Sequence, residues 1–133
     1  VDEALLATWL CDTALAPIAP ASMDTGEVCG RLQAAAAVAA PVADLLATSA
    51  ELTARLTVRA LEGASGVEEL LLCGGGVHNR ALTAAIEAAV APLPVASTAL
   101  RGIDPDAREA IGMAVLARER LAGRSPLGKV SVP

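Results

Sequence analysis

Three consecutive glycines, Gly74–Gly76, are the feature of this sequence best suited to binding a ligand. They follow the short apolar run Glu69–Cys73 and come just before Asn79, a residue type that often caps a helix. A backbone without side chains lets a ligand approach closely, and the free N–H groups of a helix start attract polar or anionic atoms. A tight strand-to-helix turn without a ligand accounts for the same residues equally well.

The glycine turn matches neither a dinucleotide-binding Gly-x-Gly-x-x-Gly pattern nor a phosphate-binding loop ending in Gly-Lys-Ser/Thr. His78, the only histidine, directly follows the turn and has the chemistry of a general base. The residues favour a capping or surface role for it, because no cysteine, serine or acid lies at a spacing that would orient the ring. Asn79 fits a helix cap, a ligand-binding amide, or both.

Glu109 is the second candidate, near the start of the last predicted helix. One side of that helix carries Glu109 with Met113, Leu116 and Arg120, and the opposite side carries an apolar stripe. We therefore expect this helix to be packed between two layers. Its first-turn carboxylate either faces a cleft and accepts ligand hydroxyl groups or is a solvated acid that the helix dipole stabilises. The residues alone favour the solvated acid.

The elements that position these candidates are predicted to be mainly helical, because alanine and leucine abound and aromatic residues make up only 1% of the chain. An all-β fold is excluded. A proline-rich break is expected over residues 16–22. We expect helices over residues 2–14, 27–39, 41–63, 79–91 and 104–122, and strands over residues 69–73 and 94–98.

The order strand, helix, strand, helix in the second half predicts a right-handed parallel β–α–β–α unit. The fold class is therefore α/β and helix-rich. We expect a single domain, in which a helical segment, residues 1–40, packs on a core formed by residues 41–133.

Charge and composition exclude several kinds of partner. Ten basic and fifteen acidic residues give a net charge of −5, which disfavours nucleic acid. The apolar run at 34–40 is too short to span a membrane, and no secretory signal is seen. Cys11, Cys29 and Cys73 have neither disulfide-framework nor metal-site spacing, so we expect no metal site and a reduced, cytoplasmic protein. Without a starting methionine, the chain is expected to be part of a longer protein.

Three strings together resemble the anhydro-N-acetylmuramic acid kinase family. Leu70–Asn79 looks like the strand and glycine turn near the end of these kinases. Gly102–Ala110, followed by Ala114–Ala117, resembles the family's next signature and is the most specific of the three. Asp44–Thr48 and Glu51–Ala54 are similar to the long helix before the strand. The resemblance covers residues 1 to about 128.

The resemblance implies an actin-like (ribonuclease H-like) kinase fold, whose two lobes close over ATP and a sugar. Such kinases convert 1,6-anhydro-N-acetylmuramic acid to N-acetylmuramic acid 6-phosphate in cell-wall recycling. This chain resembles only the C-terminal lobe, which implies nucleotide binding by Gly74, Gly75, Gly76 and Asn79 and substrate binding by Glu109. The phosphate loop, the catalytic aspartate and most contacts to ATP and Mg²⁺ are implied to lie in the N-terminal lobe. No catalytic residue is therefore expected here, and the chain alone is expected to be inactive.

Two departures and two alternatives accompany this interpretation. Met23–Val28 stands where the family usually has Lys-Ser-Thr-Gly-Arg-Glu, and the tail Val130–Pro133 lacks the family's closing Thr-Gly-Ala. A xylulose- or glycerol-type kinase also matches Glu109–Ala114, although Gly102–Asp106 argues against it. The alternative from another class is a non-catalytic helical interaction module, whose exposed apolar surface would promote a homodimer.

Overall fold

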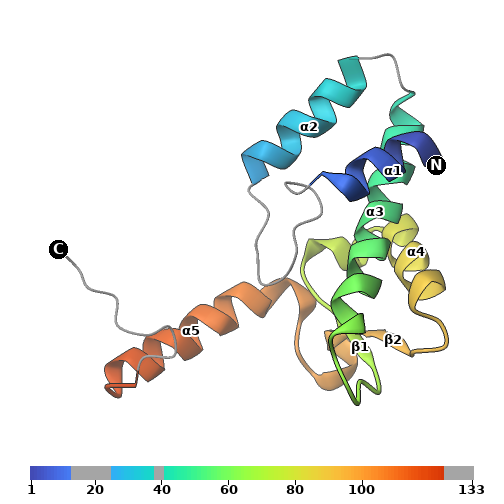
Figure 1. Cartoon of the computed structure of the whole chain (residues 1–133). Coiled ribbons are helices and arrows are strands. Elements are labelled where there is room, and N and C mark those ends of the chain that lie inside the picture. The colour runs from blue at the N-terminus through green and yellow to red at the C-terminus, as the bar shows by residue number, and fades with distance from the viewer. Residues whose placement is uncertain (13–24, 38–40, 125–133) are drawn as a thin grey trace.

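A computed structural model describes residues 1–12, 25–37 and 41–124, and most of these residues are helical (Figure 1). The α-helices are α1 (Glu3–Cys11), α2 (Thr25–Ala37), α3 (Val42–Glu62), α4 (Arg80–Val90) and α5 (Arg108–Leu121). The strands are β1 (Leu70–Leu72) and β2 (Val95–Ser97), and the 3-10 turns are η1 (Gly75–His78), η2 (Thr98–Arg101) and η3 (Pro105–Ala107). The predicted helix-rich α/β class is confirmed.

The start of the first helix follows its capping residue. The Asp2 side chain accepts a hydrogen bond from the Leu5 N–H and so begins α1. The second helix begins at Thr25, two residues before its predicted start at residue 27. Residues 13–24, with the proline-rich break and the start of the altered Met23–Val28 segment, lie outside the described part of the chain, as does the tail.

The long helix α3 supports a first core on the side facing α1 and α2 (Figure 1). Leu6 and Trp9 of α1 are buried against Leu45 and Leu52 of α3. The wholly buried Thr48 adds a polar contact, because its Oγ1 accepts a 2.9 Å hydrogen bond from the Asp2 backbone N–H. These contacts hold the N-terminal helices on α3.

A second core lies between α3, α4 and the sheet. Ala54 of α3 is completely buried and packs with Ile86 and Val90 of α4. Because alanine has a small side chain, α3 and α4 approach closely here. Partly buried side chains of α4 also pack on this core, whereas Ala60 near the end of α3 is exposed.

The strands β1 and β2 pair in parallel, as predicted, with Leu70 opposite Val95 and Leu72 opposite Ser97. The apolar run of the first strand is not buried throughout, because Leu71 at its centre is 37% exposed. Successive residues of a strand point to opposite faces. Leu70 and Leu72 pack on the second core, so Leu71 points away from it.

The last predicted helix is divided into a 3-10 turn and an α-helix. Asp104 caps η3 and not the α-helix: its Oδ1 accepts a 2.9 Å hydrogen bond from the Asp106 N–H. The α-helix α5 then begins at Arg108. The turn therefore separates the capping carboxylate from the helix that carries Glu109.

The helix α5 extends away from the other described elements (Figure 1), and none of its residues is buried. The prediction that it packs between two layers is therefore wrong for this chain. Its two apolar sides need covering elements, and the described residues supply none. Four of its large apolar side chains are exposed, namely Ile111, Met113, Val115 and Leu121.

Candidate functional site

The glycine turn starts at the carboxyl end of β1 and leads into α4. Gly74 has φ 80° and ψ 175°, a conformation that residues with a Cβ rarely adopt. Asn79 then caps α4, because its Oδ1 accepts hydrogen bonds from the N–H groups of Ala81 (3.1 Å) and Leu82 (3.2 Å). The predicted capping role of Asn79 is confirmed, and the three glycines lie where parallel sheets commonly bind ligands.

The three glycines differ in what they require of the backbone and of their surroundings. Gly75 lacks the positive φ of Gly74, and a Cβ built on it would have no atom within 4 Å. A Cβ on Gly76 would meet the Leu82 Cδ2 at 3.4 Å, an ordinary contact. Backbone geometry therefore explains glycine at position 74, whereas within this chain the space beside Gly75 is open to a ligand.

A hollow of about 450 Å³ lies beside Asn79, between α3 and the start of α4. Its walls consist mainly of small and apolar side chains: Ala43, Leu46, Ala47, Ser49, Ala50, Thr53, Asn79, Ala81 and Leu82. The two wall hydroxyls bond to their own helix: Ser49 Oγ donates to the Leu45 carbonyl (2.7 Å) and Thr53 Oγ1 to that of Ser49 (3.0 Å). Such an apolar hollow, with the polar Asn79 among its walls, suits a flat ring with polar edges.

This hollow was not predicted from the sequence. The signal that could have found it is the recurrence of alanine at positions 43, 47 and 50, which places small side chains on one face of α3. That face meets the capped start of α4, so small residues and the Asn79 amide enclose one space.

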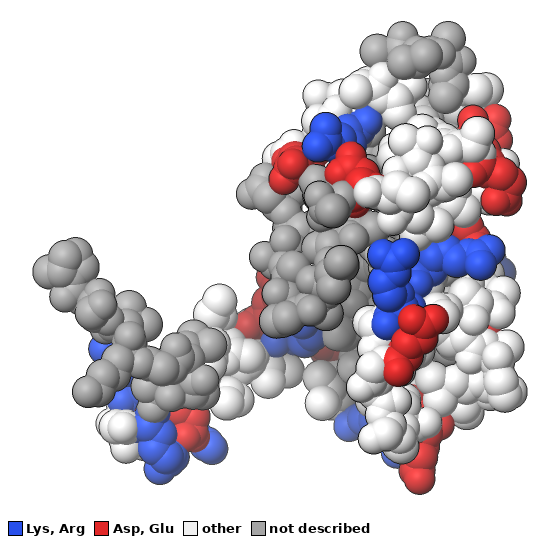
Figure 2. Space-filling model, viewed as in Figure 1, with Lys and Arg blue, Asp and Glu red and all other residues white. Residues whose placement is uncertain are grey.

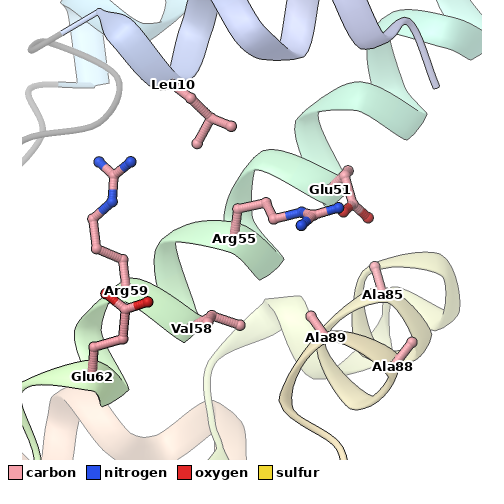
Figure 3. A pocket seen from close by; sticks show the side chains of 9 residues that line it. All are labelled: Leu10, Glu51, Arg55, Val58, Arg59, Glu62, Ala85, Ala88 and Ala89. Atoms are coloured by element: carbon pink, nitrogen blue, oxygen red, sulfur yellow. The ribbon is translucent and has the colours of Figure 1, made fainter.

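A larger hollow, about 580 Å³, is walled by α3, α4 and one residue of α1 (Figure 3). In Figure 3 the Arg55 side chain lies along α3 toward Glu51, and its Nε is 2.7 Å from Glu51 Oε1. None of its wall residues belongs to the glycine turn or to the Gly102–Ala110 string. We therefore place the candidate site at the hollow beside Asn79.

The fold brings the two most distinctive strings of the sequence together. The Gly74 N–H donates a 2.8 Å hydrogen bond to the Pro105 carbonyl. His78 Nε2 lies 2.9 Å from Asp106 Oδ2. The expectation that no acid orients His78 is wrong, because the fold brings Asp106 beside it from 28 positions along the chain.

Comparison with known proteins identifies the relatives of this chain. The family model described as anhydro-N-acetylmuramic acid kinase matches residues 1–128. The chain belongs to the anhydro-N-acetylmuramic acid kinase family.

Curated members of the anhydro-N-acetylmuramic acid kinase family match at moderate identity. The kinase of Xanthomonas campestris pv. campestris (strain 8004) is 40% identical over 127 residues, 93% of this chain and 34% of that protein. The Gloeobacter violaceus kinase is 37% identical over 92% of this chain and 34% of its own length. That of Salinibacter ruber is 38% identical over 68% of this chain and 27% of its own. The chain thus spans about a third, or less, of these relatives.

Glu109, which the family resemblance assigns to the substrate, points into solvent. Its side chain is 87% exposed, and its Oε1 lies 3.7 Å from Arg108 Nη2. Among the described residues, none forms a substrate pocket around Glu109. Its role in binding the substrate of an anhydro-N-acetylmuramic acid kinase stays a prediction.

Charges of both signs are interspersed on the face of this family member seen in Figure 2. A hydrogen bond with Glu69 raises the pKa of Arg101. Hydrogen bonds from Arg124, the larger cause, and from Arg118 lower the pKa of Glu119. Among the described residues no three His, Cys, Asp or Glu side chains cluster as a metal site would require. No helix in the described ranges has the length and hydropathy needed to cross a membrane.

Proposed function

We propose that this chain is the C-terminal, nucleotide-binding lobe of a cytoplasmic, ATP-dependent kinase with an actin-like fold. The whole enzyme would convert 1,6-anhydro-N-acetylmuramic acid to N-acetylmuramic acid 6-phosphate. The observation that carries the proposal is the family match over residues 1–128, which includes a glycine turn with an open Gly75 at the end of a parallel strand.

In this proposal the described residues bind and orient the nucleoside part of ATP. The hollow beside Asn79 has the size and the apolar walls for a base, and the open backbone at Gly75 lets the sugar–phosphate part approach. ATP supplies the phosphoryl group. Its phosphates and Mg²⁺ would be held mainly by the N-terminal lobe, so this lobe contributes positioning.

Two surfaces of the chain support its being one lobe of a larger enzyme. Within the described residues β1 pairs with a strand on one edge only, and the middle residue, Leu71, is 37% exposed. The helix α5 exposes apolar residues on a chain that spans about a third of its relatives. In an intact kinase, further strands and helices would cover these surfaces.

The family match favours this kinase over the xylulose- or glycerol-type alternative. A non-catalytic interaction module derived from the same family remains the competing proposal, and the exposed apolar face of α5 is the observation that favours it. Nucleotide binding separates the two.

Gly75→Val in the intact kinase tests the nucleotide site. A valine side chain would occupy the open space, and the loss of a backbone contact to a charged ligand should weaken ATP binding about tenfold to a hundredfold. Since no atom lies within 4 Å of the added Cβ, unfolding free energy should change by less than ~1 kcal/mol. Calorimetric titration with an ATP analogue and urea unfolding measure the two quantities.

Gly74→Ala is the matched control, because its backbone conformation strains any residue with a Cβ. It should destabilise the fold by ~1–3 kcal/mol. If Gly75→Val lowers stability as Gly74→Ala does but leaves nucleotide affinity unchanged, the triplet is only a turn. The nucleotide proposal is then wrong.

Glu109→Gln tests the substrate side of the same enzyme. A lost hydrogen bond from a charged acceptor to a sugar hydroxyl should reduce kcat/KM for the sugar about tenfold to a hundredfold. ATP affinity should be nearly unchanged, because Glu109 lies on α5 and does not line the hollow beside Asn79. Steady-state kinetics with each substrate varied separately would measure both effects.

Arg108→Gln provides the control for charge on the same turn of α5, because Arg108 is the neighbour that lies 3.7 Å from the Glu109 carboxylate. Wild-type sugar kinetics for Glu109→Gln, with at most ~1 kcal/mol lost from the helix-dipole interaction, would remove Glu109 from the site.

A further inference from the structure

His78 and Asp106 join two short turns that lie far apart in the sequence. His78 Nε2 is within hydrogen-bond distance of both Asp106 carboxylate oxygens, at 2.9 and 3.1 Å. Beside this pair, the Gly74 N–H donates to the Pro105 carbonyl at 2.8 Å. One side-chain contact and one backbone hydrogen bond thus connect η1 and its preceding residue Gly74 to η3, which leads into α5.

Both side chains project from turns that are themselves ordered by hydrogen bonds. On one side the Val77 N–H donates to the Gly74 carbonyl (3.1 Å) and the Asn79 N–H to that of Gly76 (3.0 Å). On the other side, the Asp106 N–H donates to Asp104 Oδ1 at 2.9 Å. The contact between the two side chains therefore joins two turns whose backbones are each ordered locally.

The pair is too exposed to contribute much to global stability. The side chains of His78 and Asp106 are 63% and 57% exposed, and exposed ion pairs add little to the free energy of unfolding. Its effect should instead be local, on how often η1 and η3 separate while the two cores remain folded. Hydrogen exchange of the Gly74 amide reports this opening, because its N–H is bonded to the Pro105 carbonyl across the same junction.

We propose that His78 and Asp106 form a latch that positions the glycine turn for the nucleotide, a role that rests on the nucleotide function proposed above. The latch holds Gly74 against Pro105 and thereby keeps the open backbone at Gly75 in one orientation. His78 is in this way a positioning residue.

Amide hydrogen exchange in the full 133-residue chain tests the latch independently of any ligand. In His78→Ala and in Asp106→Ala, the Gly74 amide should exchange about twofold to fivefold faster, with little change in Tm. Arg55→Ala is the matched control, because it removes a different exposed side-chain contact, that of Arg55 Nε with Glu51 Oε1 at 2.7 Å, away from the turn. It should leave Gly74 exchange unchanged. Equal Gly74 exchange rates in all variants and the wild type would overturn the latch.

Nucleotide affinity of the intact kinase tests the positioning role. His78→Ala should measurably weaken binding of an ATP analogue, and at most by the factor by which opening increases, because affinity falls with the binding-competent fraction. The reversed pair, His78→Asp with Asp106→His, should restore both exchange and affinity. Faster exchange with unchanged affinity would overturn positioning. A wild-type kinase that binds no nucleotide would overturn the proposed function, and positioning with it, whereas the exchange result on the latch would stand.

Discussion

The purified 133-residue chain should transfer no phosphoryl group from ATP to 1,6-anhydro-N-acetylmuramic acid. Phosphoryl transfer depends on aligning donor and acceptor and on neutralising the charge of the phosphates, usually with Mg²⁺. The sequence has no loop ending in Gly-Lys-Ser/Thr, and the described residues form no metal-binding cluster. A lobe that only orients the nucleoside does not align the phosphoryl donor with its acceptor, and it does not neutralise the charge of the phosphates.

The measurement is ADP release with ATP, Mg²⁺ and the sugar, on protein freed of host kinases. The match to the Xanthomonas campestris kinase covers 34% of that relative. We expect turnover only after this chain is fused to the rest of that kinase. That part alone and the fusion carrying Gly75→Val are the controls, and both should be much less active. Turnover by the chain alone, lost in the Gly75→Val chain, would show that the one-lobe proposal is wrong.

Trp9→Ala should lower the free energy of unfolding by about 3–5 kcal/mol. Trp9 is 4% exposed and is the largest side chain of the first core, where it packs with Leu6, Leu45 and Leu52. Its truncation removes apolar contacts and leaves a cavity at the junction that holds α1 on α3. Urea unfolding followed by circular dichroism would give the change.

Cys11→Ala is the matched control, because Cys11 is exposed at the end of the same helix; it should change stability by less than ~0.5 kcal/mol. The second core gives a further check, since Ala54, Ile86 and Val90 form a separate cluster. Amides of α4 should therefore keep more protection than those of α1 in Trp9→Ala. A loss below ~1 kcal/mol would contradict the packing described here.

Local sequence signals predicted the elements that position the candidate site. Asn79 caps α4 as expected, because a side-chain oxygen of that length reaches the N–H groups two and three residues on. The apolar run before the glycines forms a parallel strand, and Gly63 ends α3 as predicted. The strings that pointed to the kinase family lie within the region that the family model matches.

The sequence by itself determined the helix-rich α/β class, the capped start of α4 and the position of the glycine turn, because each depends on residues a few positions apart. Only the tertiary structure decided that Asp106 meets His78, since spacing along the chain does not report contacts made when two strands pair. The hollow beside Asn79 likewise needs α3 and α4 together. Apolar residues on two sides of α5 predicted burial, but burial requires covering layers, and the described residues provide none.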